Sequence, residues 1–168
     1  MTIADAWRGG IKWKDVPAYL CAQLTGAFAG VAAANLMFDL RVFFASHHQR
    51  NGLPQLFSKF IATFGLLVVI WGCVRVRSRL IAFAVAAYIM AAYWFTASTS
   101  FANPAVTLAR SASDTFAGIR PIDTPAFIGA QLLGATAATV LFRWLAPSIP
   151  RQAEAVIVGS AAELNTDD

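Results

Sequence analysis

The residue best suited to chemistry is Asn103, in the short sequence Asn103-Pro104-Ala105 between two apolar stretches. Asparagine is a favoured N-cap and proline a favoured first helical residue, so the sequence predicts a half-helix that starts here and runs to about residue 115. Its free N–H groups and positive dipole end repel protons and cations, while the Asn103 amide offers hydrogen bonds to neutral hydroxylated solutes. Passive permeation needs no further chemistry.

The other polar residues do not form a catalytic or metal-binding constellation. His47 and His48 are adjacent in a polar segment, where solvated loop residues are the main interpretation and metal or pH sensing is the alternative. Asp114 and Asp123 are interpreted as turn and capping residues. No nucleophile and base have suitable spacing, so the sequence predicts neither an enzyme nor a cofactor nor a bound metal.

The elements that must position Asn103 are long apolar runs. The chain has 168 residues, of which 58% are hydrophobic and only 13% charged, and its mean hydropathy is +0.59. Runs at 16–38, 56–74, 80–97 and 125–145 approach the roughly 20 residues that a spanning helix requires. Residues 98–110 are too short and too mixed to cross, and a helix that starts at membrane depth needs protein or water beside it. We therefore predict a re-entrant element that faces an aqueous path.

The net charge of +4 does not indicate nucleic acid as a partner, because the basic residues lie in groups beside the apolar runs. These groups are Arg8, Lys12 and Lys14; Arg75, Arg77 and Arg79; and Arg143 with Arg151. The preference of basic residues for cytoplasmic loops places all three groups inside. Arg41 and Arg50 then fall outside, against this preference. The sequence predicts an integral protein of the lipid bilayer with both termini inside.

The chain also contains an internal repeat, because residues 17–27 and 125–135 share seven identities in eleven positions. The flanking pairs are Asp15 with Asp123 and, after a length difference of three residues, Thr2-Ile3-Ala4 with Thr107-Leu108-Ala109. Three apolar runs separate the starts of the two copies, so the copies have opposite orientations in the membrane. Inverted repeats are typical of transport proteins whose path lies at the pseudo-symmetry axis.

Asn103-Pro104-Ala105, in its setting after three spans and before a fourth, resembles the second signature loop of the major intrinsic proteins, the aquaporins and glycerol facilitators. The resemblance implies an all-α membrane protein with four transmembrane helices plus one re-entrant half-helix, an aquaporin-like fold missing its first two helices and first signature loop. It also implies a passive channel without cofactors that assembles as a homotetramer. We expect a partial channel domain over residues 1–146 and a disordered cytoplasmic tail over 147–168.

The resemblance assigns a selectivity filter, and there the sequence departs from the family pattern. Val106 stands where an arginine usually follows the signature, and the aligned filter positions Ala91 and Ser100 are also small. Arg110, one turn further on, is a candidate vestibule cation. The wide filter predicts passage of water, glycerol, urea and undissociated arsenous or boric acid. This pattern resembles the bacterial branch associated with arsenic resistance, which implies the bacterial inner membrane.

Two further departures leave alternatives open. The family usually has a buried glutamate where this chain has Lys59, which either snorkels to the interface or faces the signature loop. The missing first part of the fold suggests that Met1 is an internal start in a longer reading frame, or that the gene is a remnant. A passive channel for small neutral solutes is the predicted function. The alternative is a truncated, non-conducting remnant or modulatory subunit of a full-length channel.

Overall fold

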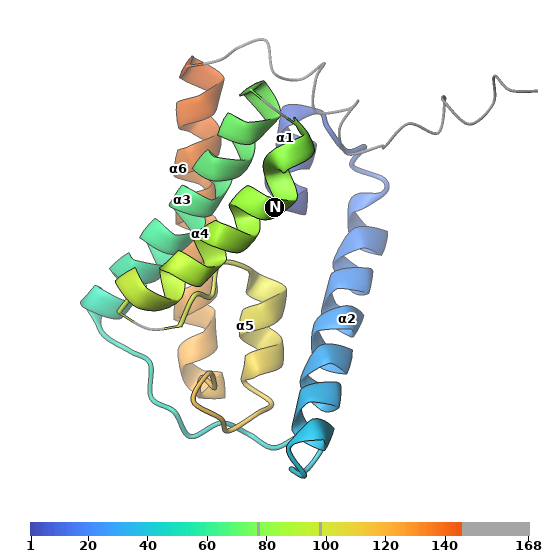
Figure 1. Cartoon of the computed structure of the whole chain (residues 1–168), viewed down its shortest axis with the longest axis vertical. Helices are drawn as coiled ribbons and strands as arrows, with labels where there is room; N and C mark the ends of the chain where they lie inside the picture. Colours follow the sequence, from blue (N-terminus) through green and yellow to red (C-terminus); the bar gives the residue numbers. More distant parts are fainter. Residues whose placement is uncertain (77, 98, 146–168) are drawn as a thin grey trace, which may run out of the picture.

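The computed structural model describes residues 1–76, 78–97 and 99–145, and these residues form helices and connecting loops without strands (Figure 1). The helices are α1 (Thr2–Arg8), α2 (Val16–Met37), α3 (Leu53–Val76), α4 (Ile81–Phe95), α5 (Pro104–Arg110) and α6 (Thr124–Leu145), with 3-10 turns at Ser78–Leu80 and Pro121–Asp123. The expected tail over 147–168, together with Arg77, Ser98 and Arg151, lies outside the described residues.

Three of the helices are long and apolar enough to cross a membrane, namely α2, α3 and the segment Pro121–Leu145 that contains α6. They correspond to the apolar runs at 16–38, 56–74 and 125–145. The run at 80–97 forms α4, which is apolar but has only 15 residues, fewer than a straight spanning helix requires. A fourth transmembrane helix therefore stays a prediction.

The two copies of the repeat form equivalent helices. Both α2 and α6 have 22 residues, and a constant shift of 108 residues relates their bounds. Each helix has proline at its second position, Pro17 or Pro125, where the missing N–H group costs no hydrogen bond and the ring favours helical φ. The internal repeat is therefore a structural repeat as well.

Each copy also joins its long helix to a short one through the same pair of side chains. In the first copy, Gln23 Nε2 of α2 donates to Thr2 Oγ1 of α1 at 2.5 Å. In the second copy, Gln131 Nε2 of α6 donates to Thr107 Oγ1 of α5 at 2.8 Å. The short helices α1 and α5 begin near the middle of the molecule and run to opposite ends (Figure 1). The two copies thus have the opposite orientations that the sequence predicts.

The main core lies between α3 and α6. Its buried side chains include Leu66, Leu67, Ile70, Trp71 and Val74 of α3 and Ala138 and Phe142 of α6. Gly134 lets the two main chains approach closely, because a Cβ atom at this position would lie 2.5 Å from the carbonyl oxygen of Phe60. Small residues at helix crossings are the usual means of close packing between membrane helices, where no hydrophobic force drives association.

Arg8 and Arg143, which belong to different basic groups of the sequence, lie at one end of the bundle. The guanidinium of Arg8 lies 4.6 Å from the ring centre of Trp71 in α3, and that of Arg143 lies 5.9 Å from the ring centre of Trp7. In such contacts the cation is attracted to the electron-rich face of the aromatic ring. The ends of α1, α3 and α6 therefore lie together, as the charge pattern predicts.

The half-helix is shorter than the sequence predicts, since α5 ends at Arg110 rather than near residue 115. Residues 38–52, named the strap here, provide the reason. The strap donates hydrogen bonds from Phe44 N to Ala112 O at 3.1 Å and from Ser46 N to Ser111 O at 3.0 Å. The carbonyl oxygens of Ser111 and Ala112 accept hydrogen bonds from the strap rather than from a further helical turn, so α5 ends at Arg110.

Substitution at Gly134 tests the α3–α6 crossing. We expect Gly134→Ala to destabilise the chain by about 1–3 kcal/mol, because the added Cβ would overlap the α3 main chain. Gly129, on the same helix, has no atom within 4 Å of the position that an alanine Cβ would occupy, so Gly129→Ala is the matched control and should be neutral or stabilising by up to about 1 kcal/mol. Denaturant titration of both variants in mixed micelles measures the difference, and equal stabilities would contradict this packing.

Candidate pore site

The site begins with the cap of α5. Asn103 has an extended backbone, and its Oδ1 accepts a hydrogen bond from Ala105 N at 2.9 Å. Pro104 occupies the first helical position, and Thr107 N donates the first helical bond to the carbonyl of Asn103 at 3.0 Å. The donors of the Asn103 side chain are on Nδ2, which this cap does not use. The predicted N-cap is therefore confirmed.

A cavity of about 310 Å³ lies where the two short helices begin. Met1 to Ala4 at the start of α1 and Asn103 to Ala105 at the start of α5 line the same space, together with side chains of α2 and α6. Its lining is mainly apolar, and its polar side chains include Gln23, Gln131 and Thr139. Apolar walls with a few placed hydrogen-bonding groups are typical of sites that hold small neutral molecules.

Side chains of α3 and α6 hold the segment that leads into the signature. Gln131 Nε2 donates to Phe101 O at 3.1 Å as well as to Thr107. Ser58 Oγ accepts from Ala97 N at 2.9 Å. Residues 99–103 have no regular secondary structure, so their backbone polar groups depend on side chains that reach them from neighbouring helices.

Lys59 provides a further support, and its placement decides between the two interpretations left open by the sequence. The residue is fully buried, and its Nζ donates to the carbonyl of Thr99. The ammonium also lies 5.4 Å from the ring centre of Phe101 and 5.7 Å from that of Phe127. A lysine that snorkels would keep its charge at the interface, so that interpretation is wrong. Lys59 faces the signature loop as a hydrogen-bond donor.

The residues assigned to the filter lie on separate elements. Ala91 is exposed on α4, Ser100 is half-buried in the loop before the signature, and Val106 is exposed on α5. Val106 and Arg110 line a hollow of about 280 Å³ against α2. The grouping of Ala91, Ser100 and Val106 into one filter stays a prediction.

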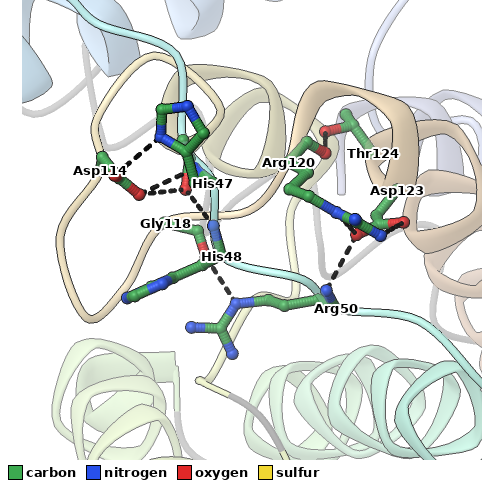
Figure 2. Close-up of polar contacts among 9 residues, drawn as sticks. His47, His48, Arg50, Asp114, Gly118, Arg120, Asp123 and Thr124 are labelled. Carbon is green, nitrogen blue, oxygen red and sulfur yellow. Dashed lines mark hydrogen bonds and ion pairs between the residues drawn. The ribbon is translucent and has the colours of Figure 1, made fainter.

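A network of polar contacts fixes the strap over the loop that follows α5 (Figure 2). Arg50 is central to it, and the sequence pointed to this residue only as an exception to the charge bias. Its main-chain N donates to Asp123 Oδ2 at 2.9 Å, and its Nε and Nη2 donate to the carbonyls of Gly118 and Phe116 at 2.5 and 2.6 Å. Arg120 also pairs with Asp123, at 2.9 Å. Asp123 therefore joins the strap to the start of α6.

His47 and Asp114 form the second part of this network. Asp114 Oδ1 accepts from the main-chain N of His47 at 2.8 Å, and Asp114 Oδ2 lies 3.0 Å from the Nδ1 atom of the same residue (Figure 2). The hydrogen bond from the His47 backbone is the main reason that the pKa of Asp114 lies below its ordinary value, and the His47 side chain adds to it. Within residues 1–76, 78–97 and 99–145, no three His, Cys, Asp or Glu side chains are placed to hold a metal ion.

Comparison with known proteins shows the family to which the chain is related. The family model described as "Major intrinsic protein" matches residues 73–166. The chain is 49% identical over 145 residues to Aquaglyceroporin AqpS of Rhizobium meliloti (strain 1021), which covers 86% of this chain and 62% of the relative. It is 33% identical over 115 residues to Aquaporin NIP1-3 of Oryza sativa subsp. japonica, which covers 64% of this chain and 40% of the relative. No solved structure matches the chain significantly.

These matches, with the helical membrane architecture, define a class of integral membrane channels. The chain belongs to the major intrinsic protein family. Members of this family are channels and not enzymes, as the sequence predicts. The chain spans 62% of the length of the first relative and 40% of the second.

Because Lys59 acts as a hydrogen-bond donor, the glutamate that the family resemblance implies at this position should not be tolerated here. Lys59→Glu should destabilise the chain by about 3–5 kcal/mol, because a carboxylate would face the Thr99 carbonyl in a buried site without a donor between them. Lys59→Gln retains an N–H donor at a similar position and is the control. Denaturant titration in mixed micelles compares the two, and a glutamate variant as stable as the glutamine variant would show that Lys59 is not needed as a donor.

The Asp114 contacts predict how the strap depends on pH. The pKa of Asp114 is lower in the folded chain than its ordinary value of 3.8. The ionised carboxylate therefore stabilises the fold fully at pH values above 3.8, and this stabilisation is lost as the pH falls through the lowered pKa. The chemical shift of the His47 amide, followed by NMR in detergent, should therefore titrate with a midpoint below 3.8. Asp114→Asn should abolish this transition, whereas Asp39→Asn elsewhere in the strap should retain it. A midpoint at or above the ordinary value contradicts the assignment.

Proposed function

We propose that this chain forms the wall of a passive channel for small neutral solutes, namely glycerol, water and undissociated arsenite-like polyol mimics. The observation that carries the proposal is the start of α5, where Asn103 caps the helix at a cavity shared with the start of α1. Helices that begin inside an apolar protein and diverge to opposite ends are an arrangement suited to a path across a membrane.

The expected selectivity follows from the groups around this path. Main-chain N–H groups and the positive dipole end of α5 disfavour cations and protons, while amide groups such as Asn103 Nδ2 replace hydrogen bonds that a solute loses with water. Ala91, Ser100 and Val106 are the proposed filter, and none of them carries charge or bulk. Arg110 is the proposed vestibule cation, because it lies one turn beyond Val106 and lines the same hollow. A filter of this kind admits polyols as well as water.

Two features of the relatives support the finer points of the proposal. The bacterial relative is named an aquaglyceroporin, a word that extends the solutes from water to glycerol. Its bacterial origin also supports the bacterial inner membrane as the location of this chain. The family association suggests a homotetramer in the lipid bilayer, with one path per protomer.

A second candidate function is a non-conducting subunit that modulates a longer channel. The chain spans 62% of its aquaglyceroporin relative, and α2 buries only Val16, Val31 and Asn35 among its 22 residues. A helix with so little buried surface has room for a partner as well as for lipid. Flux through the 168-residue chain alone distinguishes this candidate from the channel.

Substitution of Val106 tests the filter. In proteoliposomes that contain the 168-residue chain, Val106→Arg should lower glycerol flux at least about tenfold, since a long cation would narrow the opening, while water flux should change less than about threefold. Val106→Leu is the control, because leucine is larger than valine but has neither a charge nor a long side chain. We expect it to change glycerol flux by less than about threefold. Stopped-flow light scattering measures both fluxes, and arsenite uptake is measured in the same vesicles.

Each outcome of this experiment has a definite meaning. Glycerol flux through the unsubstituted chain that is no faster than in empty vesicles overturns the channel proposal and favours the modulatory subunit. Equal glycerol flux through the valine and arginine forms would retain a channel but remove position 106 from its filter. Glycerol flux without arsenite flux would exclude the polyol mimic as a solute.

A further inference from the structure

The wall of the cavity at the starts of α1 and α5 contains two buried polar side chains that have hydrogen-bonding capacity to spare. Thr63 of α3 and Gln131 of α6 both line this cavity of about 310 Å³, and they are only 5% and 1% exposed. Neither Thr63 Oγ1 nor Gln131 Oε1 has a hydrogen-bond partner among the described residues. Buried polar groups are nearly always satisfied, by protein or by an ordered molecule, because an unpaired group destabilises the fold. These two atoms therefore indicate a bound hydrogen-bonding group.

The orientation of the Gln131 amide is fixed by its other contacts. Its Nε2 donates to Phe101 O at 3.1 Å and to Thr107 Oγ1 at 2.8 Å. A backbone carbonyl only accepts hydrogen bonds, so the amide nitrogen and not the amide oxygen must face Phe101. Both amide hydrogens are then in use, and Oε1 remains as an acceptor. A partner for this atom must supply a hydrogen.

A second threonine in the same cavity shows what distinguishes Thr63. Thr139 of α6 is fully buried and lines the cavity as well, but its Oγ1 donates to the carbonyl of Ala135 at 2.8 Å, one turn back along its own helix. A helical threonine has two common rotamers, and this bond is available to only one of them. Thr63 makes no such bond, so its hydroxyl is free both to donate and to accept.

The rest of the cavity determines the chemistry of its occupant. None of the described residues that line it has a charged side chain, and most of them are apolar. An ion would have no counter-charge there, which makes its burial costly. Asn103 lines the same space, and its Nδ2 group adds donors that the helix cap does not use. Apolar walls with a few donors and acceptors suit a small neutral molecule that carries a hydroxyl group.

We propose that Thr63 Oγ1 and Gln131 Oε1 together bind one hydroxyl group of a small neutral molecule, either water or a polyol such as glycerol. The bound hydroxyl donates its hydrogen to Gln131 Oε1, and its oxygen accepts the hydrogen of the Thr63 hydroxyl. The site is separate from the proposed filter, because Ala91, Ser100 and Val106 are not among the residues that line this cavity. For a polyol, the inference rests on the proposed channel function.

A molecule at this site is linked to the signature segment through a single amide. The Gln131 group that accepts from the bound hydroxyl on one side donates to Phe101 and Thr107 on the other. Hydrogen bonds in such a chain polarise one another, so occupancy strengthens the bonds that hold the loop and the half-helix. Thr63 adds α3 to the same network. The bound hydroxyl thus bridges the two helices that support the signature.

The site is tested by the carbon NMR signal of the Gln131 side-chain carbonyl, in the complete 168-residue chain in detergent. A hydrogen bond to a carbonyl oxygen moves this signal to higher frequency. Thr63→Val retains the side-chain shape without the hydroxyl, so it should move the signal to lower frequency. Thr63→Ser retains a hydroxyl and should resemble the unsubstituted chain.

Thr139→Val is the matched control, because it removes a hydroxyl of the same cavity that is already bonded within its own helix. It should leave the Gln131 carbonyl signal unchanged. Thermal unfolding of each variant shows whether the fold is intact, and the serine variant provides the comparison if the valine variant does not fold.

A glycerol titration identifies the source of the hydroxyl. A saturable change of the Gln131 carbonyl signal that is lost in Thr63→Val assigns a polyol to the site, whereas a signal that glycerol does not change assigns water. If a polyol binds, Thr63→Val should also lower glycerol flux in proteoliposomes at least about threefold relative to Thr139→Val, since one hydrogen bond to the solute is lost.

The remaining outcomes decide against the site. A Gln131 carbonyl signal that is the same in Thr63→Val and in the unsubstituted chain overturns the proposal, as does a signal that Thr139→Val moves by the same amount. Nuclear Overhauser effects between detergent chains and the Thr63 methyl group would make an apolar chain the occupant and overturn it too. Because the NMR signal reports binding without flux, the site can stand in a chain that does not conduct, and the channel proposal can stand without the site.

Discussion

The start of a helix inside an apolar protein is the constraint on which this structure depends. The first turn of α5 has backbone N–H groups without helical partners, and in an apolar setting each unpaired group costs several kcal/mol. Asn103 satisfies one of them through its own side chain, and Pro104 removes another by having no N–H group. The remaining polar groups of the segment need partners from other helices. Those partners determine how α3 and α6 must be placed.

Gln131 and Lys59 meet that need from two sides. Gln131 donates to the carbonyl of Phe101 and to the hydroxyl of Thr107, so a single amide holds both the loop and the half-helix against α6. Lys59 donates to the carbonyl of Thr99 from α3. Because the close approach of α3 and α6 depends on Gly134, the position of the signature depends on a glycine that does not contact it. Packing and site geometry are therefore coupled.

The repeat explains why the same solution occurs twice with opposite orientation. Gln23 and Thr2 repeat the bond between Gln131 and Thr107, and each pair joins a short helix to a 22-residue helix. The two copies differ in their surroundings, since α6 is packed against α3 and the equivalent face of α2 is largely exposed.

Local sequence signals were sufficient for much of this fold. Four signals depend on residues close together in the chain: the apolar runs, proline at the second helical position, the Asn103 cap and the repeated PAxxxAQLxGA pattern. They were sufficient to predict the three helices long enough to span a membrane, the start of α5 and the pairing of the two copies. Family membership followed from the same short motif in its setting.

Only the tertiary structure decided features that depend on distant partners. Lys59 was ambiguous in the sequence because its choice between interface and loop depends on Thr99, 40 residues away. The end of α5 depends on the strap that takes the carbonyls of Ser111 and Ala112, and Arg50 gained its role from Asp123 and Gly118. Whether a helix face is covered or open likewise depends on which helix lies beside it, and composition cannot report that.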